Sequence, residues 1–153
     1  MKRFSFRLDR VLDVRRRQEE QAQQVLAEAR RERNQSQDRL DECEQALEEN
    51  TAQFQTQVQN GFSAQEALLH SNFCDRLRTE AWAEQEVLAE CENQVEARRE
   101  ELVTALQKKK ILETLREHKR SEHLTITRRE EQKELDDQAS RQNHRERKKL
   151  THD

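Results

Sequence analysis

The 153-residue sequence has no proline, no tyrosine and a single glycine, Gly61. Proline ends or kinks a helix, and glycine supplies the positive φ of many tight turns, so the backbone has one evident place to reverse direction. A single glycine also excludes a glycine-rich phosphate loop. The sequence therefore favours two long helices joined near Asn60-Gly61-Phe62-Ser63.

Apolar residues are scarce as well. They make up 31% of the chain against 40% charged residues, which is too little for a compact core of this length. Disorder would give similar polarity, but disordered segments are enriched in Pro, Gly and Ser and lack a helical period. The strong helix formers Glu, Gln, Arg, Ala, Leu and Lys dominate here. We predict an all-α fold, an antiparallel coiled-coil hairpin with a C-terminal helical overhang: helix 4–59, turn 60–63, helix 64–127, and a polar tail 128–153 that is frayed until bound.

No apolar run reaches the length of a signal peptide or the roughly 20 residues that span a bilayer, so we expect a cytosolic protein. Three widely spaced cysteines, Cys43, Cys74 and Cys91, form no CxxC pair. Reduced thiols used as small apolar residues are expected, rather than a disulfide or zinc framework.

A 3-4 apolar alternation predicts which face of each helix pairs. Between Ala29 and Leu40 the spacing is eleven residues, which predicts a local unwinding with loose pairing over the polar residues 30–39. The predicted seam of the first helix is Phe4, Leu8, Val11, Arg15, Gln18, Ala22, Val25 and Ala29, then Leu40, Cys43, Leu47, Asn50, Phe54 and Gln57. The second helix begins with a capping box at Ser63 and Glu66. Its predicted seam is Ala67, Cys74, Leu77, Ala81, Leu88, Cys91, Val95, Leu102, Ala105, Leu112 and Ile126, with His70, Glu84, Arg98, Lys109, Arg116, Lys119 and His123 at the polar places.

Charge is distributed unevenly along the chain. Residues 1–17 and residues 102–129 each carry a net +5, whereas residues 18–101 carry a net −12. A fold-back at Gly61 would bring the two basic segments together at one end and leave the turn at an acidic end.

The sequence offers no catalytic or metal-ligand spacing, so we expect no enzyme, cofactor or metal site. The runs Arg15-Arg16-Arg17 and Lys108-Lys109-Lys110 make the best case for nucleic acid. However, the chain has a net charge of −3 and no aromatic residue interrupts those runs, so an acidic protein surface is the expected partner. Phe73 and Trp82 fall beside seam positions; they either close over the flank of the seam or, for Phe73 with Leu69 and Leu77, form an apolar patch for a partner.

The opening residues 1–15 place Phe4, Phe6, Leu8 and Val11-Leu12 ahead of an Arg/Glu/Gln-rich helix. This pattern resembles the amino terminus of the FliJ family of bacterial flagellar export proteins, as do the chain length, the two-helix plan and the Asn60-Gly61 turn. The resemblance implies a non-enzymatic stalk, similar to the coiled coil of the rotary ATP synthase gamma subunit, that enters the pore of a hexameric export ATPase (FliI). It further implies contacts with the linker of the export gate protein FlhA and with export chaperones. The implied location is the cytoplasmic face of the membrane at the flagellar base, reached through partners only.

In that family the gate contact uses a Phe and a Leu four residues later, a spacing that falls on Phe73 and Leu77 here. Family positions on the first helix that carry aromatic residues in some members fall on Ala46 and Asn50, which leaves a first-helix contribution open. Charge independently suggests an ATPase-facing basic end comprising Arg7, Arg10, Arg15, Arg16, Lys108, Lys109, Lys110 and Arg116. The alternative is a generic coiled-coil scaffold or a self-associating rod without an export role.

Overall fold

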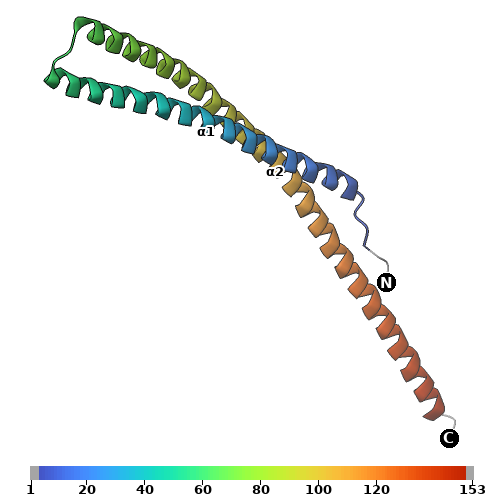
Figure 1. Ribbon diagram of the computed structural model, residues 1–153. Helices are drawn as coiled ribbons and strands as arrows, with labels where there is room; N and C mark the ends of the chain where they lie inside the picture. The colour runs from blue at the N-terminus through green and yellow to red at the C-terminus, as the bar shows by residue number, and fades with distance from the viewer. Residues whose placement is uncertain (1–3, 151–153) are drawn as a thin grey trace. The chain divides into compact units, whose positions relative to one another are not determined.

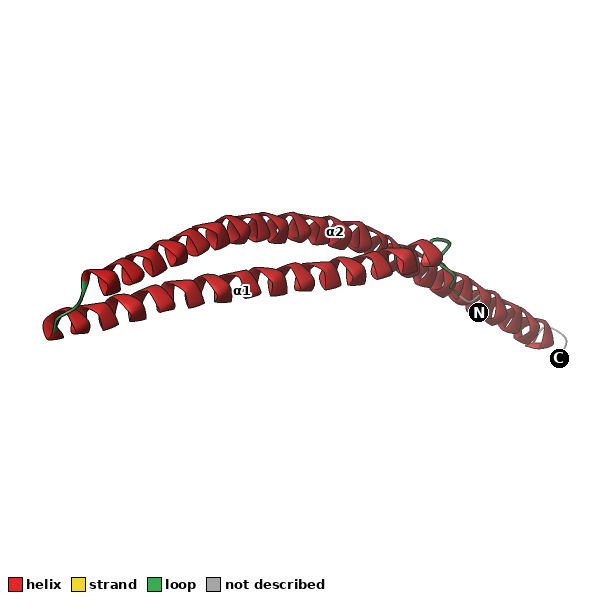
Figure 2. Ribbon diagram, turned by 45° about the horizontal axis from the view of Figure 1, so that its top comes forward, coloured by secondary structure: helices red, strands yellow, loops and turns green. Residues whose placement is uncertain are grey.

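The structure, a computed structural model, describes the backbone of residues 4–150 and the side chains of residues 4–147. Two helices account for nearly all of these residues, α1 (Asp9–Asn60) and α2 (Ala64–Leu150) (Figure 1). Within the described chain there is no strand (Figure 2). The predicted two-helix fold is confirmed.

Each helix differs from its expected bounds mainly at the end away from the turn. α1 begins at Asp9 rather than at residue 4, and residues 4–8 lead into it with the ring of Phe6 buried. The Asp9 N–H donates to the Phe6 carbonyl at 3.1 Å, and the Asp9 carboxylate lies in the first turn, where the helix dipole favours an anion. At the other end, α2 continues through residues 128–150.

The turn is built as its residues predict. Gly61 has φ +90°, a value that L side chains rarely adopt. The capping box is confirmed, because the Ser63 N–H donates to Glu66 Oε2 at 2.7 Å and the Glu66 N–H donates to Ser63 Oγ at 3.2 Å. The bond from the Ser63 backbone holds the pKa of Glu66 below its usual value.

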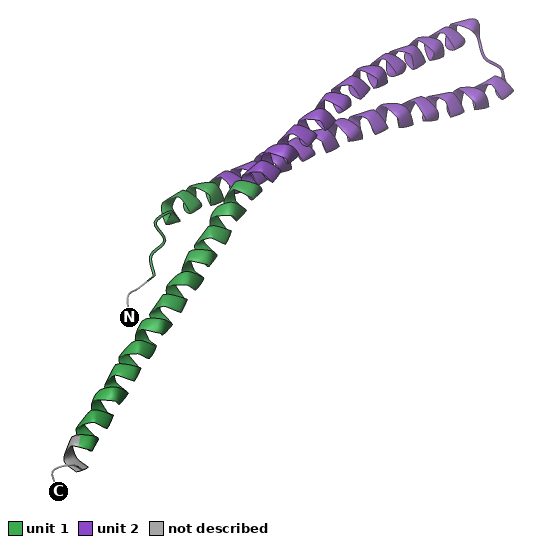
Figure 3. Cartoon of the chain, turned by 180° about the vertical axis from the view of Figure 1, so that it is seen from behind, with its two compact units in different colours: residues 1–17, 107–153 green, residues 18–106 purple. Residues whose placement is uncertain are grey.

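The chain divides into two compact units (Figure 3). Unit 1 comprises residues 1–17 and 107–153, and unit 2 comprises residues 18–106. In each unit a segment of α1 packs antiparallel to a segment of α2: Arg116 bonds Asp9 in unit 1, and Arg39 bonds Glu84 in unit 2.

The seam of α1 keeps one register without interruption. Its least exposed positions, spaced alternately by three and four residues, are Leu12, Arg15, Glu19, Ala22, Leu26, Ala29, Arg33, Ser36, Leu40, Cys43, Leu47, Asn50 and Phe54. The expected seam positions Val11, Gln18 and Gln57 are wrong, because all three are exposed. Leu12 is 1% exposed against 41% for Val11.

The same register shows that the local unwinding predicted between Ala29 and Leu40 is absent. Arg33 and Ser36 bridge Ala29 and Leu40 in steps of four, three and four residues, which is an ordinary part of the lattice. The predicted unwinding arose because the first seam was assigned one residue early at Val11, Gln18 and Val25. Val25 is half-buried, but its neighbour Leu26 takes the buried place.

The predicted seam of α2 is confirmed from Ala67 to Leu112, apart from exposed Arg98. The prediction of Ile126 as a seam residue is wrong, since its side chain is 55% exposed. The segment that faces this part of α2 is not helical, because residues 4–8 precede α1. No regular seam therefore continues along α2 as far as Ile126.

Polar seam residues in unit 2 find partners across the helix pair. The Cys74 thiol donates to Asn50 Oδ1 at 3.6 Å, and the rings of Phe54 and His70 stack with centroids 4.0 Å apart. Ser36 is the contrast: its side chain is fully buried and its Oγ has no hydrogen-bond partner.

The register predicts a difference between two adjacent residues. Leu12→Ala should lower the free energy of unfolding by about 2 kcal/mol or more, because it empties a buried seam position. Val11→Ala should change it by less than about 0.5 kcal/mol, as for other exposed sites. Urea unfolding followed by circular dichroism measures both, and equal losses would contradict the register.

Ser36 provides a second test of the seam. Ser36→Ala should leave the free energy of unfolding unchanged or raise it by about 1 kcal/mol, because it removes a buried hydroxyl that has no partner. Thr51→Ala serves as a control, since the exposed Thr51 hydroxyl donates to the Leu47 carbonyl within its own helix. A clear loss of stability in Ser36→Ala would mean that the hydroxyl is bonded in solution.

Candidate interaction surfaces

The two units carry opposite charge. Unit 1 has 21 Lys and Arg against 12 Asp and Glu, a net +9, while unit 2 has 8 against 20, a net −12. The structural division thus falls where the sign of the charge changes. Each unit presents a field of one dominant sign, which favours partners of the opposite sign.

The eight basic residues assigned to the ATPase-facing surface all belong to unit 1, but they are not equivalent. Arg7, Arg10, Lys108 and Lys110 are exposed, and no ion pair is found for them among the described residues. Arg15 and Lys109 are half-buried at seam positions. The other two, Arg16 and Arg116, make ion pairs inside the unit.

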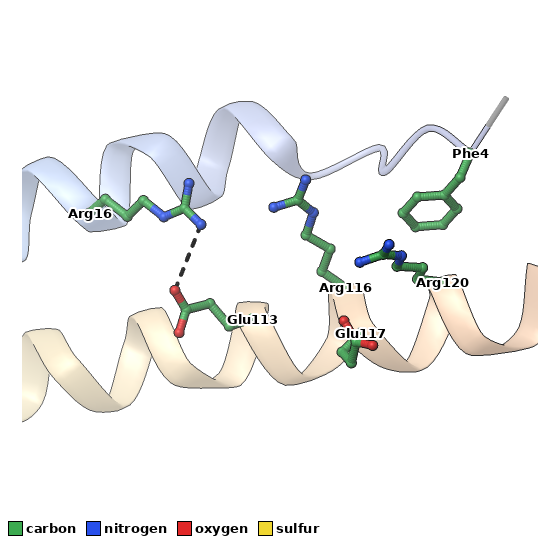
Figure 4. A pocket seen from close by; sticks show the side chains of 6 residues that line it. All are labelled: Phe4, Arg16, Glu113, Arg116, Glu117 and Arg120. Atoms are coloured by element: carbon green, nitrogen blue, oxygen red, sulfur yellow. Dashed lines mark ion pairs between the residues drawn. The ribbon is translucent and has the colours of Figure 1, made fainter.

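Both arginines line a pocket of about 580 Å³, together with Phe4, Glu113, Glu117 and Arg120 (Figure 4). Arg16 Nη2 lies 3.8 Å from Glu113 Oε1, and Arg116 Nε lies 3.3 Å from Asp9 Oδ1. Sequence reasoning missed Arg120 and Phe4 as lining residues. The i, i+4 spacing of Arg116 and Arg120 placed both on one face and was the available signal.

A second, more apolar hollow in unit 1 lies where residues 4–8 meet α2; we call it the N-terminal groove. It has a volume of about 840 Å³. The ring of Phe4 meets that of His123 edge-on, with centroids 5.6 Å apart. The lining residues are Phe4, Ser5, Phe6, Arg7, Leu8, Leu115, Lys119, Glu122, His123 and Ile126.

The two residues assigned to the gate contact lie in different environments in unit 2. Leu77 is a seam residue and only 6% exposed. Phe73 is half-buried, with the Arg76 guanidinium carbon 5.2 Å from its ring centre, a cation–π contact. Leu69, one helical turn before Phe73, is 65% exposed, so on this face of α2 the accessible apolar surface includes Leu69 and the outer part of Phe73.

The first-helix positions Ala46 and Asn50 are half-buried, and the side chain of Asn50 accepts a hydrogen bond from the Cys74 thiol. Trp82 is 63% exposed and therefore does not close over the seam flank. In this part of the chain, residues on the seam lattice pack inward, whereas those one position away are available to partners.

The cysteines lie on the seam and are free thiols. Partial burial, together with the nearby carboxylates of Glu80, Glu84 and Glu42, raises the pKa of the Cys43 thiol, which disfavours the thiolate form. Over the described residues, no three His, Cys, Asp or Glu side chains gather in a way that could hold a metal ion. Neither helix, as far as it is described, contains a stretch apolar enough to cross a membrane.

The fold defines a two-helix coiled-coil protein. The family model described as "Flagellar FliJ protein" matches residues 4–148. The chain therefore belongs to the FliJ family, whose members are coiled-coil proteins of the flagellar type III export system.

Among solved structures, the chain is similar to one described as a putative YscO homolog from Chlamydia trachomatis. The TM-score is 0.56 at 19% identity, over 94% of this chain and 99% of that chain. At this identity the likeness supports the fold alone. No curated protein matches the sequence.

Proposed function

We propose that this chain is a non-enzymatic stalk that binds the hexameric export ATPase through unit 1 and the linker of the export gate through Leu69 and Phe73 of unit 2. The observation that carries the proposal is the coincidence of the charge division with the division into units: net +9 in unit 1 and net −12 in unit 2. Membership of the FliJ family supports a partner within the export apparatus.

The ATPase contact is proposed for the exposed part of the basic surface. Arg7, Arg10, Lys108 and Lys110 keep their charges free for a partner, whereas Arg16 and Arg116 are partly neutralised by Glu113 and Asp9. An acidic pore surface would attract such a surface at long range and orient it before contact. ATP hydrolysis itself remains with the ATPase in this proposal.

The gate contact is proposed for Leu69 and Phe73, with Leu77 as their support. Leu69 and Phe73 are four residues apart and lie on one face of α2, as the anchors of a helix-mediated contact require. Leu77 is buried in the seam and anchors this part of α2 against α1. Arg76 covers part of the Phe73 ring and would move aside or join the contact.

One chain that carries both surfaces can link its two partners. When unit 1 is bound to the ATPase, the gate-binding residues are held close to the gate, which raises their effective concentration there. Export chaperones are a third class of partner in this proposal, and the membrane is reached only through partners.

The ATPase contact predicts the effect of charge reversal at the free basic residues. The variant with Arg7, Arg10, Lys108 and Lys110 changed to Glu should lose stimulation of the purified export ATPase at least about tenfold, because several attractive pairs become repulsive. Stimulation is measured as ATP hydrolysis against concentration of the chain. These four sites are preferred to Arg16, whose reversal would place a third carboxylate beside Asp13 and Glu113.

A matched control changes Arg128, Arg129, Lys133 and Arg141 to Glu, which alters the net charge by the same amount at exposed sites of the same unit. The control should retain most of the stimulation. If both variants behave alike, net charge alone is responsible and the proposed surface is wrong.

The gate contact predicts that Phe73→Ala and Leu69→Ala each weaken binding to the gate linker by about tenfold or more, the loss typical of an apolar anchor. Isothermal titration with the purified linker measures the dissociation constant. Leu77→Met, a conservative change at the buried support, should have a smaller effect.

Leu68→Ala and Trp82→Ala are the controls, because both residues are exposed and apolar but belong to another face of α2. Their affinity for the linker should stay within about twofold of the wild type. Equal losses at Leu68 and Phe73 would place the contact elsewhere. Unchanged helicity by circular dichroism shows that each variant is folded.

A further inference from the structure

The N-terminal groove combines apolar walls with a basic rim. Phe4, Leu115 and Ile126 supply apolar walls, and Ile126 is 55% exposed. Phe6 and Leu12, by contrast, are buried and complete the packing of this part of unit 1. The groove therefore exposes apolar surface that the fold itself does not use.

We propose that the N-terminal groove binds an acidic amphipathic helix of a partner protein, whose apolar residues occupy the groove while its carboxylates face the basic rim. The proposal deepens the ATPase-facing role of unit 1 and rests on it. It adds a specific apolar socket to what would otherwise be a purely electrostatic contact.

The size of the groove fits this occupant. About 840 Å³ is within the roughly 300 to 1,000 Å³ of ordinary ligand pockets, enough for two or three large apolar side chains. The walls come from two segments, residues 4–8 and the turns of α2 from Leu115 to Ile126, so the hollow lies between them. A helix with apolar residues at i, i+3 and i+4 presents such a set of side chains to a groove.

The charge around the groove selects an acidic partner. Arg7 on the rim is exposed and has no ion pair among the described residues, and the unit that holds the groove carries a net +9. The acidic rim residue Glu122 is already engaged, by Lys119 at 2.8 Å and His118 at 3.1 Å, and these contacts hold its pKa below the usual value. A basic helix would meet Arg7 without a free carboxylate to compensate.

The test uses the full chain and a synthetic helical peptide labelled with fluorescein. The peptide carries Leu at i, i+3, i+4 and i+7 and Glu at most other positions, and a twin peptide carries Lys in place of each Glu. Fluorescence anisotropy is measured against the wild type, Ile126→Glu and the matched control Leu135→Glu. Leu135 is 59% exposed on the same helix but does not line the groove, so the two variants add the same charge at similar exposure.

We expect the acidic peptide to bind the wild type and the Leu135→Glu variant within about twofold of each other, and Ile126→Glu at least about tenfold more weakly. The twin peptide should not bind. Equal binding by Ile126→Glu and Leu135→Glu, binding of the twin peptide, or no binding of the acidic peptide would each overturn the groove proposal. Ile126→Glu leaves Arg7, Arg10, Lys108 and Lys110 in place. The ATPase contact proposed for those four residues is tested separately, by ATPase stimulation. That contact would therefore stand even if the peptide experiment contradicted the groove proposal.

Discussion

The shared 3-4 register of the two helices is the constraint on which the remaining features depend. A pair of helices has only one seam in which to bury side chains, and among the described residues few apolar ones are buried in it: Leu12, Leu26, Ala29, Leu40, Cys74 and Leu77. Because so little apolar surface is buried, polar pairs between the two helices help to fix the register of α1 against α2. In unit 2, Arg39 with Glu84 and Asn50 with Cys74 each join positions that only one register brings together.

Some of this fold could be predicted from the sequence and some could not, and the difference lies in how unambiguous each seam is. In α2, apolar seam residues such as Cys74, Leu77 and Leu88 fit one lattice, and apart from Arg98 the expected positions were correct as far as Leu112. In α1, Val11-Leu12 and Val25-Leu26 offer two adjacent apolar choices each. Only the partner helix decides between them, and it buries the larger leucines.

The interaction surfaces show the same division. Summing charges along the sequence correctly anticipated a basic and an acidic part, because net charge does not depend on rotamers. Which basic groups remain free does depend on tertiary contacts. Arg16 pairs with Glu113 and Arg116 pairs with Asp9, and neither pair can be predicted from a local sequence pattern. The groove was likewise hidden, since it exists only because α1 begins at Asp9 and residues 4–8 do not continue the helix.

A pair of helices also leaves most of its side chains in contact with solvent. Strongly perturbed titrating groups require a desolvated interior, whereas the resolved pKa shifts here, at Cys43, Glu66 and Glu122, come from partial burial or from direct local contacts. What the fold does supply is a strict separation between lattice positions and their neighbours. Leu77 on the lattice is buried in the pair, whereas Leu69 and Phe73, each one position before a lattice residue, are less buried. A chain built in this way can acquire or lose binding partners by substitution at off-lattice positions, while the seam that aligns its helices stays intact.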